Sequence, residues 1–147
     1  MEQLIKELEP KLKLLETKYD KEIIELHVEY GDKKISVCPK CGAVSERVHS
    51  HHTAYAWDMP IQNHKVKLIF HVKEFFCDNE NCSQKIFAER FDFLGSTKKR
   101  TKRLEKYILD VSKSSSAMQT ERLMRSSVAE ISNDTIMRLV KKNTGEQ

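Results

Sequence analysis

The sequence has no long apolar run and few glycines, and each shortage excludes a class of protein. No apolar segment approaches the ~20 residues that a membrane-spanning helix requires. The four glycines, at positions 31, 42, 95 and 145, lie too far apart to form a glycine-rich phosphate-binding loop. The first residues also lack the basic and then apolar order of a secretory signal. We therefore expect a cytoplasmic protein without a membrane segment.

The composition is sufficient for a modest hydrophobic core. Of the 147 residues, 39% are hydrophobic and 33% are charged, so a second source of stability such as a metal ion would be useful. The chain has four cysteines. In a cytoplasmic protein, cysteines are more often metal ligands than disulfide partners, because the compartment keeps thiols reduced.

Positive charge is concentrated in one segment of the chain. Residues 1–96 have 14 basic and 16 acidic side chains, whereas residues 97–142 have 12 basic and 5 acidic ones, a net charge of +7. A local excess of this kind is typical of a surface that binds a polyanion such as nucleic acid.

Hydrophobic periodicity divides the chain into three parts and predicts an α+β fold. The first part, residues 1–20, is predicted to be an N-terminal amphipathic helix that Pro10 interrupts or kinks. This helix would either pack on its own domain or form a homodimer seam. Its apolar side chains recur at helical spacing at Leu4, Ile5, Leu8, Leu12 and Leu15.

The second part, residues 21–93, is predicted to be a β-rich module. We expect strands over Ile23–Tyr30 and over residues 33–37, on either side of a turn at Gly31-Asp32. A further strand over Val66–Val72 leads directly to the third cysteine.

The third part, residues 94–147, is predicted to be a basic helical region. The period of Leu104, Tyr107, Ile108 and Val111 indicates one helix. After a polar break at residues 112–116, short helices are expected over residues 121–125 and 134–142, the last capped by Ser132 or Asn133. Three helices with a short turn between the last two have the outline of a helix-turn-helix.

The cysteines fall in two pairs whose spacing predicts one structural zinc site. Cys38 and Cys41 form a C-x-x-C knuckle, in which Gly42 allows the backbone to turn. Cys77 and Cys82 supply the second pair from a slightly longer loop. Four thiolates close the tetrahedron around the ion and leave no open position for water. The alternative interpretation is four unrelated buried cysteines.

The histidines are open to two interpretations. His49-Ser50-His51-His52, with His64 and His71 further along, could supply a second metal site or solvated polar side chains in a loop.

Loops are also expected at Pro60 and at Asp78-Asn79. No local pattern of a Ser/His/Asp or Cys/His catalytic centre is present in the sequence.

Several short motifs occur in a set order over roughly residues 20–142. They are Cys38-Pro39-Lys40-Cys41-Gly42, Ser45, Val48-His49-Ser50, Asp58-Met59-Pro60-Ile61, Phe75-Phe76-Cys77-Asp78-Asn79-Glu80-Asn81-Cys82, Ile86-Phe87-Ala88-Glu89-Arg90-Phe91, Arg100-Thr101-Lys102-Arg103-Leu104 and Ser132-Asn133-Asp134-Thr135-Ile136-Met137-Arg138-Leu139. In order and spacing, this series resembles the ISL-three family of bacterial insertion-sequence transposases.

The resemblance implies a zinc-binding domain and a helix-turn-helix that together recognise the terminal inverted repeats of a transposon, in the nucleoid of a bacterial cell. In the family, a catalytic domain follows that holds magnesium for strand transfer. The sequence ends at Gln147 without such a domain, so we expect a DNA-binding protein that is not an enzyme. Family-typical Tyr and Arg positions before the Asp-Leu-Pro motif are His52 and Ala54 here, and Lys73-Glu74 replaces a basic pair. The helical part keeps its charge.

On this hypothesis the helical region contacts double-stranded DNA. The basic run would contact phosphates, and the last helix would lie in the major groove with its ends on base edges and backbone. The predicted contact residues are Lys98, Lys99, Arg100, Lys102, Arg103, Lys106, Asn133, Thr135, Arg138, Lys141 and Lys142.

Other interpretations of the same residues remain open. The basic run could be a solvated charged helix, and the last helix could serve core packing alone. A different class of function is a zinc-stabilised protein–protein interaction or dimerisation module, which the acidic balance of residues 1–96 favours. DNA binding would show a steep salt dependence, whereas the interaction module would show none.

Overall fold

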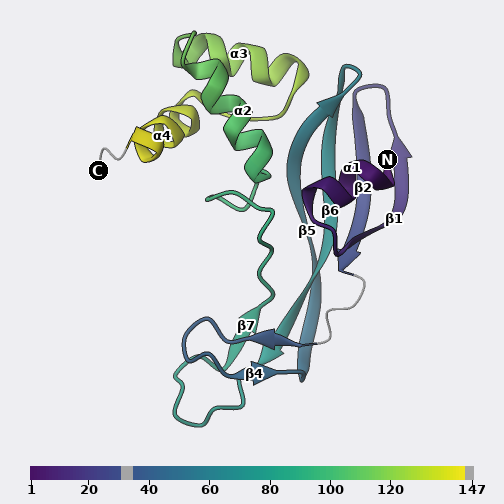
Figure 1. Ribbon diagram of the computed structural model, residues 1–147, viewed down its shortest axis with the longest axis vertical. Helices are drawn as coiled ribbons and strands as arrows, with labels where there is room; N and C mark the ends of the chain where they lie inside the picture. The colour runs from purple at the N-terminus through teal and green to yellow at the C-terminus, as the bar shows by residue number, and fades with distance from the viewer. Residues whose placement is uncertain (31–34, 145–147) are drawn as a thin grey trace.

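The computed structural model describes residues 1–30 and 35–144 and has an α+β architecture (Figure 1). Two of its elements, β5 and β6, form a long antiparallel hairpin that connects a sheet at one end with a small cysteine-rich module at the other. The elements are α1 (Glu2–Leu8), β1 (Leu12–Tyr19), β2 (Ile23–Tyr30), β3 (Ser36–Val37), β4 (Val44–Ser45), β5 (Val48–Ile61), β6 (His64–Phe76), β7 (Ile86–Ala88), α2 (Lys102–Ser112), α3 (Ala117–Ser127) and α4 (Asn133–Thr144).

The main sheet has the strand order β1-β2-β6-β5, and β7 pairs with the far end of β6. β1 and β2 are antiparallel, as are β5 and β6, but β2 and β6 run parallel. The parallel pairing uses residues 65–70 of β6, and the pairing with β7 uses residues 74–76. The strand β6 therefore belongs both to the main sheet and to the cysteine-rich module.

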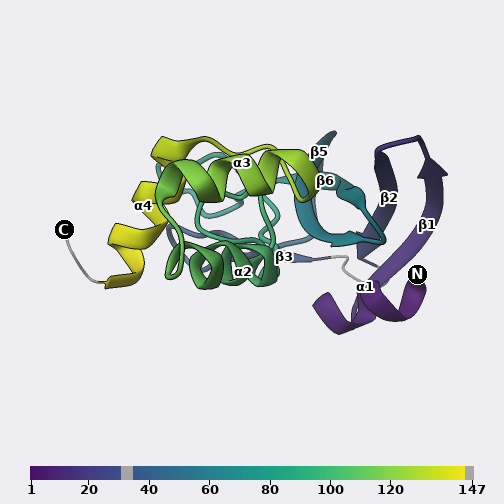
Figure 2. The ribbon, with the colours of Figure 1, turned by 90° about the horizontal axis from the view of Figure 1, so that it is seen from above.

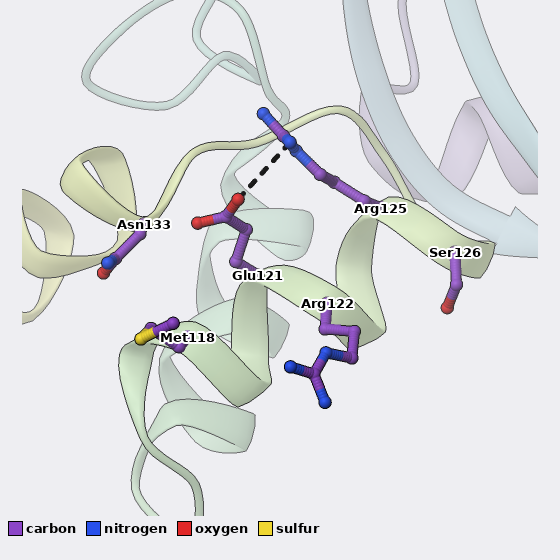
Figure 3. A pocket seen from close by; sticks show the side chains of 6 residues that line it. All are labelled: Met118, Glu121, Arg122, Arg125, Ser126 and Asn133. Atoms are coloured by element: carbon purple, nitrogen blue, oxygen red, sulfur yellow. Dashed lines mark ion pairs between the residues drawn. The ribbon is translucent and has the colours of Figure 1, made fainter.

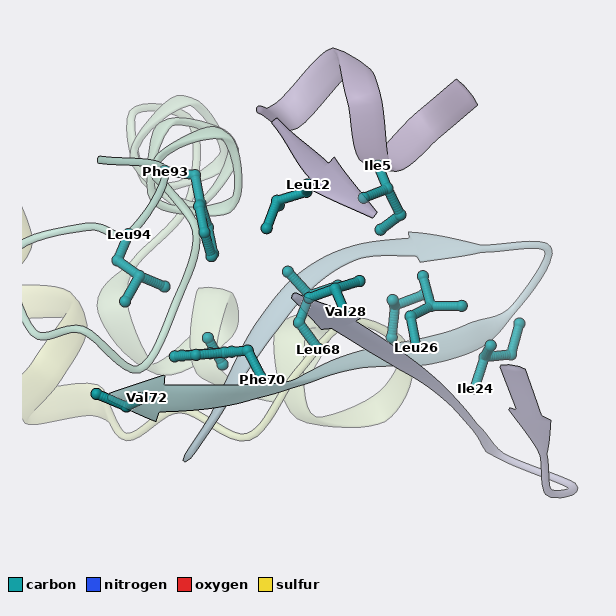
Figure 4. Packing of buried hydrophobic residues seen from close by; sticks show 12 residues of the cluster. Ile5, Leu12, Ile24, Leu26, Val28, Leu68, Phe70, Val72, Phe93 and Leu94 are labelled. Carbon is teal, nitrogen blue, oxygen red and sulfur yellow. The ribbon is translucent and has the colours of Figure 1, made fainter. Parts of the chain in front are cut away.

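One face of the main sheet forms a hydrophobic core (Figure 4). Apolar residues alternate with more exposed ones along β2 (Ile24, Leu26, Val28) and β6, as expected for strands with one buried face. Ile5 of α1, which is fully buried, and Phe93 from the segment after β7 pack against this face.

The predicted N-terminal helix over residues 1–20 is wrong beyond Leu8. The helix α1 ends there, before Pro10, and the chain turns into β1. A β-bulge between Leu14 and Glu16 shifts the alternation of β1 by one residue, which gives its leucines a spacing that resembles a helical one. The burial of Ile5 favours packing of α1 on its own domain over a dimer seam.

Two expectations for the β-rich part need correction. The strand expected over residues 33–37, across a turn from β2, is β3 (Ser36–Val37) in the described residues, and it pairs with β4 in a separate two-stranded sheet. The turn predicted at Gly31-Asp32 lies outside the described residues. His49-Ser50-His51-His52 and Pro60 belong to β5 and not to loops. Most of the first half of β5 is exposed, so its sequence lacks the apolar alternation by which strands are recognised.

All three predicted C-terminal helices are present, but α3 (Ala117–Ser127) extends beyond the predicted residues 121–125 at both ends. Thr101 caps α2, Ser116 caps α3 through a capping box with Gln119, and the Ser132 hydroxyl accepts the backbone N–H of Thr135 at the start of α4. The helices lie on the β5 side of the sheet, away from β1, in both orientations (Figures 1 and 2). Their shared core contains Leu104, Ile108, Met124 and Ile136, together with Trp57 of β5. In the described part of the chain, no helix is long and apolar enough to cross a membrane.

Candidate zinc centre and nucleic-acid interface

Four cysteines from two turns converge at the end of the β5–β6 hairpin. Cys38 and Cys41 follow β3, Cys77 follows β6, and Cys82 lies in the loop that leads to β7. All four Sγ atoms lie within 4.8 Å of one another, with 3.5 Å between Cys41 and Cys77 and 4.0 Å between Cys38 and Cys82. Zn–S bonds of ~2.3 Å in a tetrahedron place sulfurs slightly under ~4 Å apart, so the spacing fits a zinc ion.

The first knuckle has the backbone geometry that its sequence predicts. Gly42 has a φ of +77°, in the left-handed region where glycine is favoured. The turn is closed by hydrogen bonds from Gly42 N to Cys38 O and from Cys38 N to Ala43 O, both 2.9 Å. The Ala43 backbone N–H also donates to the Cys41 sulfur and, with Asn79, lowers the pKa of that thiol to about 6.

The second pair shows why the cluster needs a cation. The Asn79 backbone N–H lowers the pKa of Cys77, but burial and the three neighbouring cysteines outweigh it and raise the pKa to about 12. Four thiolates at these distances repel one another unless a positive ion lies between them. A Zn²⁺ ion supplies that charge and binds the thiolate form of all four side chains.

The zinc centre is structural in kind. It has four thiolate ligands and therefore no open position for a substrate or a reactive water. Phe75 and Phe87, whose ring centroids are 5.7 Å apart, pack with Cys38, Cys77 and Cys82 in a small separate core. The ion therefore stabilises a module whose own apolar core is small.

A family model matches this module. Residues 36–82 match the family model of the zinc finger of transposase IS204/IS1001/IS1096/IS1165. The matched segment begins at β3 and ends at the fourth cysteine, so it contains all four zinc ligands. This part of the chain is similar to that zinc finger, and its four clustered cysteines form a site for a structural zinc ion. No curated protein and no solved structure matches the chain.

Arg103, one of the predicted DNA contacts, forms its hydrogen bonds and ion pair within the protein. Its Nε donates to Asp58 Oδ1 at 2.8 Å, and its Nη2 pairs with the other carboxylate oxygen. Thr101 Oγ1 donates to the same Asp58 oxygen at 2.8 Å, and Arg103 Nη1 donates to the Leu4 carbonyl at 3.3 Å. The ion pair, which raises the pKa of Arg103, joins β5, α2 and α1. This placement favours a structural role for Arg103 over a contact with DNA.

Arg100 is also largely buried. Only 5% of it is exposed. Arg100 and Trp57 of β5 form an isolated β-bridge, whose hydrogen bonds are made by the two neighbours of Arg100. Trp57 N donates to Lys99 O at 2.9 Å, and Thr101 N donates to Trp57 O at 3.0 Å. Burial lowers the pKa of Arg100.

Two basic segments that are far apart in the sequence meet at one cavity of 470 Å³. Lys99 and Arg100 line it from the segment before α2, and Thr135, Arg138 and Lys142 line it from α4. Five of the predicted contact residues are therefore brought together.

The remaining predicted residues lie elsewhere. Lys102 lines a separate cavity of 220 Å³ together with the acidic residues Glu7, Glu9 and Asp92. Asn133 lines a third cavity, next to α3 (Figure 3). Lys98, Lys106 and Lys141 are exposed.

Sequence reasoning missed the residues that join the sheet to the helices. Asp58, which is 2% exposed, and Thr101, which is fully buried, are the centre of this junction. No pattern in the sequence signals this contact, because Asp58 and Thr101 lie 43 residues apart and belong to separate motifs. The histidines form no metal cluster among the described residues, where the cysteines are the one such group.

Proposed function

We propose that the chain is a zinc-dependent DNA-binding protein that resembles the terminal-repeat-recognition part of a transposase. In this proposal the zinc ribbon stabilises the fold, and the helical region contacts the duplex. The protein binds DNA without strand transfer. The observation that supports the proposal is the meeting of two basic segments at one cavity, where Lys99, Arg138 and Lys142 lie close together.

In this proposal, α4 is the helix that contacts the major groove of the DNA. Ile136 and Leu139 are buried against the other helices, whereas the basic residues Arg138, Lys141 and Lys142 are exposed. This amphipathic arrangement leaves a basic face that fits the major groove. Asp134 lies in the first turn of α4, where a carboxylate interacts favourably with the helix dipole.

Binding of the zinc-loaded protein to an ISL-three-type inverted repeat and to a scrambled duplex, measured by fluorescence anisotropy at several salt concentrations, tests the proposal. We expect tighter binding to the repeat and a log–log salt slope of about −0.9 for each phosphate contacted. Equal affinity for both duplexes, or affinity that does not change with salt, would contradict the proposal.

The alternative, a protein–protein interaction or dimerisation module, is favoured by one feature of the zinc ribbon. Val37 and Val44, which are partners in the β3–β4 pair, are 53% and 62% exposed, and Ile35 next to them is 50% exposed. Sedimentation velocity of the wild type and of Val44→Ser tests this second function. A zinc-dependent dimer that the substitution removes would favour it, and a monomer in both would exclude self-association.

A further inference from the structure

The lining of the 470 Å³ cavity consists almost entirely of cations and hydroxyl groups. Four of its eight lining residues are basic (Lys99, Arg100, Arg138 and Lys142), three carry hydroxyl groups, and one is a leucine. No carboxylate of the described residues belongs to this lining. By contrast, the cavity next to α3 contains Glu121, which pairs with Arg125 at 3.4 Å (Figure 3).

Arg100 is the least exposed of these cations and lacks a counterion. Its Nη2 donates to Thr97 Oγ1 at 2.9 Å, but its Nε is buried without a hydrogen-bond partner. It forms no ion pair with any residue in the described ranges, and Glu105 acts on it only at longer range. A buried cation without an anionic partner is unfavourable, and a guanidinium is well suited to a tetrahedral oxyanion.

We propose that this cavity binds a phosphate group, which is neutralised by Lys99, Arg138 and Lys142 together with the guanidinium charge of Arg100. The inference rests on the proposed function in one respect: the phosphate is taken to be a phosphodiester of the DNA backbone. Free inorganic phosphate has the same chemistry and is distinguished experimentally.

The first experiment compares salt slopes for duplex binding. Arg138→Gln removes a charge from the cavity, and Arg122→Gln, on the exposed surface of α3, removes an equal charge from the cavity that contains Glu121. We expect Arg138→Gln to reduce the magnitude of the slope by about 1 and Arg122→Gln to leave it unchanged. Equal slopes for wild type and both variants would overturn the cavity as a phosphate site while the proposed DNA binding stands.

The second experiment uses inorganic phosphate and measures the thermal midpoint, with chloride at matched ionic strength as reference. We expect phosphate to raise the Tm of the wild type and of Arg122→Gln, but not that of Arg138→Gln or Arg100→Met. Without phosphate, Arg100→Met is expected to melt no lower than the wild type, because it removes a cation that has no counterion. A lower Tm with an intact phosphate response would show that Arg100 is purely structural and would overturn the proposal.

Together, the two experiments distinguish failure of the phosphate site from failure of the proposed DNA binding. If the wild type does not bind duplex DNA but shows a phosphate response that requires Arg138, the cavity stands with free phosphate as its ligand and the proposed function fails. If Arg138→Gln changes neither the salt slope of duplex binding nor the rise in Tm caused by phosphate, the phosphate site is overturned.

Discussion

At the scale of single residues, the junction between β5 and α2 depends on the Asp58–Arg103 ion pair. The side chain of Asp58 is 3% exposed and that of Arg103 is 32% exposed, so loss of each partner has a different effect. Arg103→Met leaves a buried carboxylate with only Thr101, and we expect it to lower the free energy of unfolding by about 3 kcal/mol. Asp58→Asn leaves a partly solvated guanidinium, so its effect should be smaller. Urea denaturation followed by the fluorescence of Trp57, the one tryptophan of the chain, measures both.

The double variant Asp58→Asn/Arg103→Met is the control for this prediction. Because it removes both charges, it should destabilise the protein by clearly less than the sum of the single effects. Additive effects would mean that the two side chains do not interact. The basic run in the sequence predicted a phosphate contact for Arg103, because sequence alone does not reveal that a buried carboxylate 45 residues away pairs with it.

At the scale of elements, α3 depends on its N-terminal cap. Ser116 Oγ accepts the Gln119 backbone N–H at 3.1 Å, and the Gln119 side chain accepts the Ser116 N–H at 3.0 Å. Ser116→Ala should lower the free energy of unfolding by about 1 kcal/mol, whereas Ser114→Ala, at an exposed position outside the helix, should have little effect. Thermal denaturation by circular dichroism compares the two variants, and equal Tm values would show that the capping box does not stabilise α3.

The same elements show what sequence patterns do and do not determine. The caps and the 3.6-residue period of α2 and α4 are local, so these helices were predicted closely, as were β2 and β6 with their buried faces. The prediction failed at β1, where a bulge changes the alternation, and at β5, whose polar first half is held by pairing with β6. In the zinc ribbon, the two cysteine pairs were sufficient to predict the ligand set, because their local spacing already limits the geometry.

At the scale of the whole molecule, zinc should hold one end of the structure and not the other. The zinc ribbon has its own small core, whereas the helices share a core with Trp57 and contain no zinc ligand. Structural zinc contributes on the order of 10 kcal/mol of apparent binding free energy, so its removal by a chelator should unfold the ribbon. We expect amide hydrogens in residues 36–45 and 77–88 to lose protection from exchange, while those of α2–α4 keep it.

The strand β6 determines how far this unfolding spreads. Its residues 65–70 have β2 on one side and β5 on the other, whereas residues 74–76 pair with β7 and with the largely exposed first half of β5. Loss of the ribbon removes β7 from this far end, so unfolding should loosen it and stop near Val72. Trp57, whose side chain packs among the helices, should therefore keep its emission maximum after chelation. Cys38→Ser should reproduce the exchange pattern of the chelated protein without a chelator, because it removes one of four ligands. A shift of Trp57 emission in parallel with zinc release would mean instead that the ribbon, the sheet and the helices unfold as one cooperative unit. In that case, removal of zinc would also abolish DNA binding, because the helices would unfold with the ribbon.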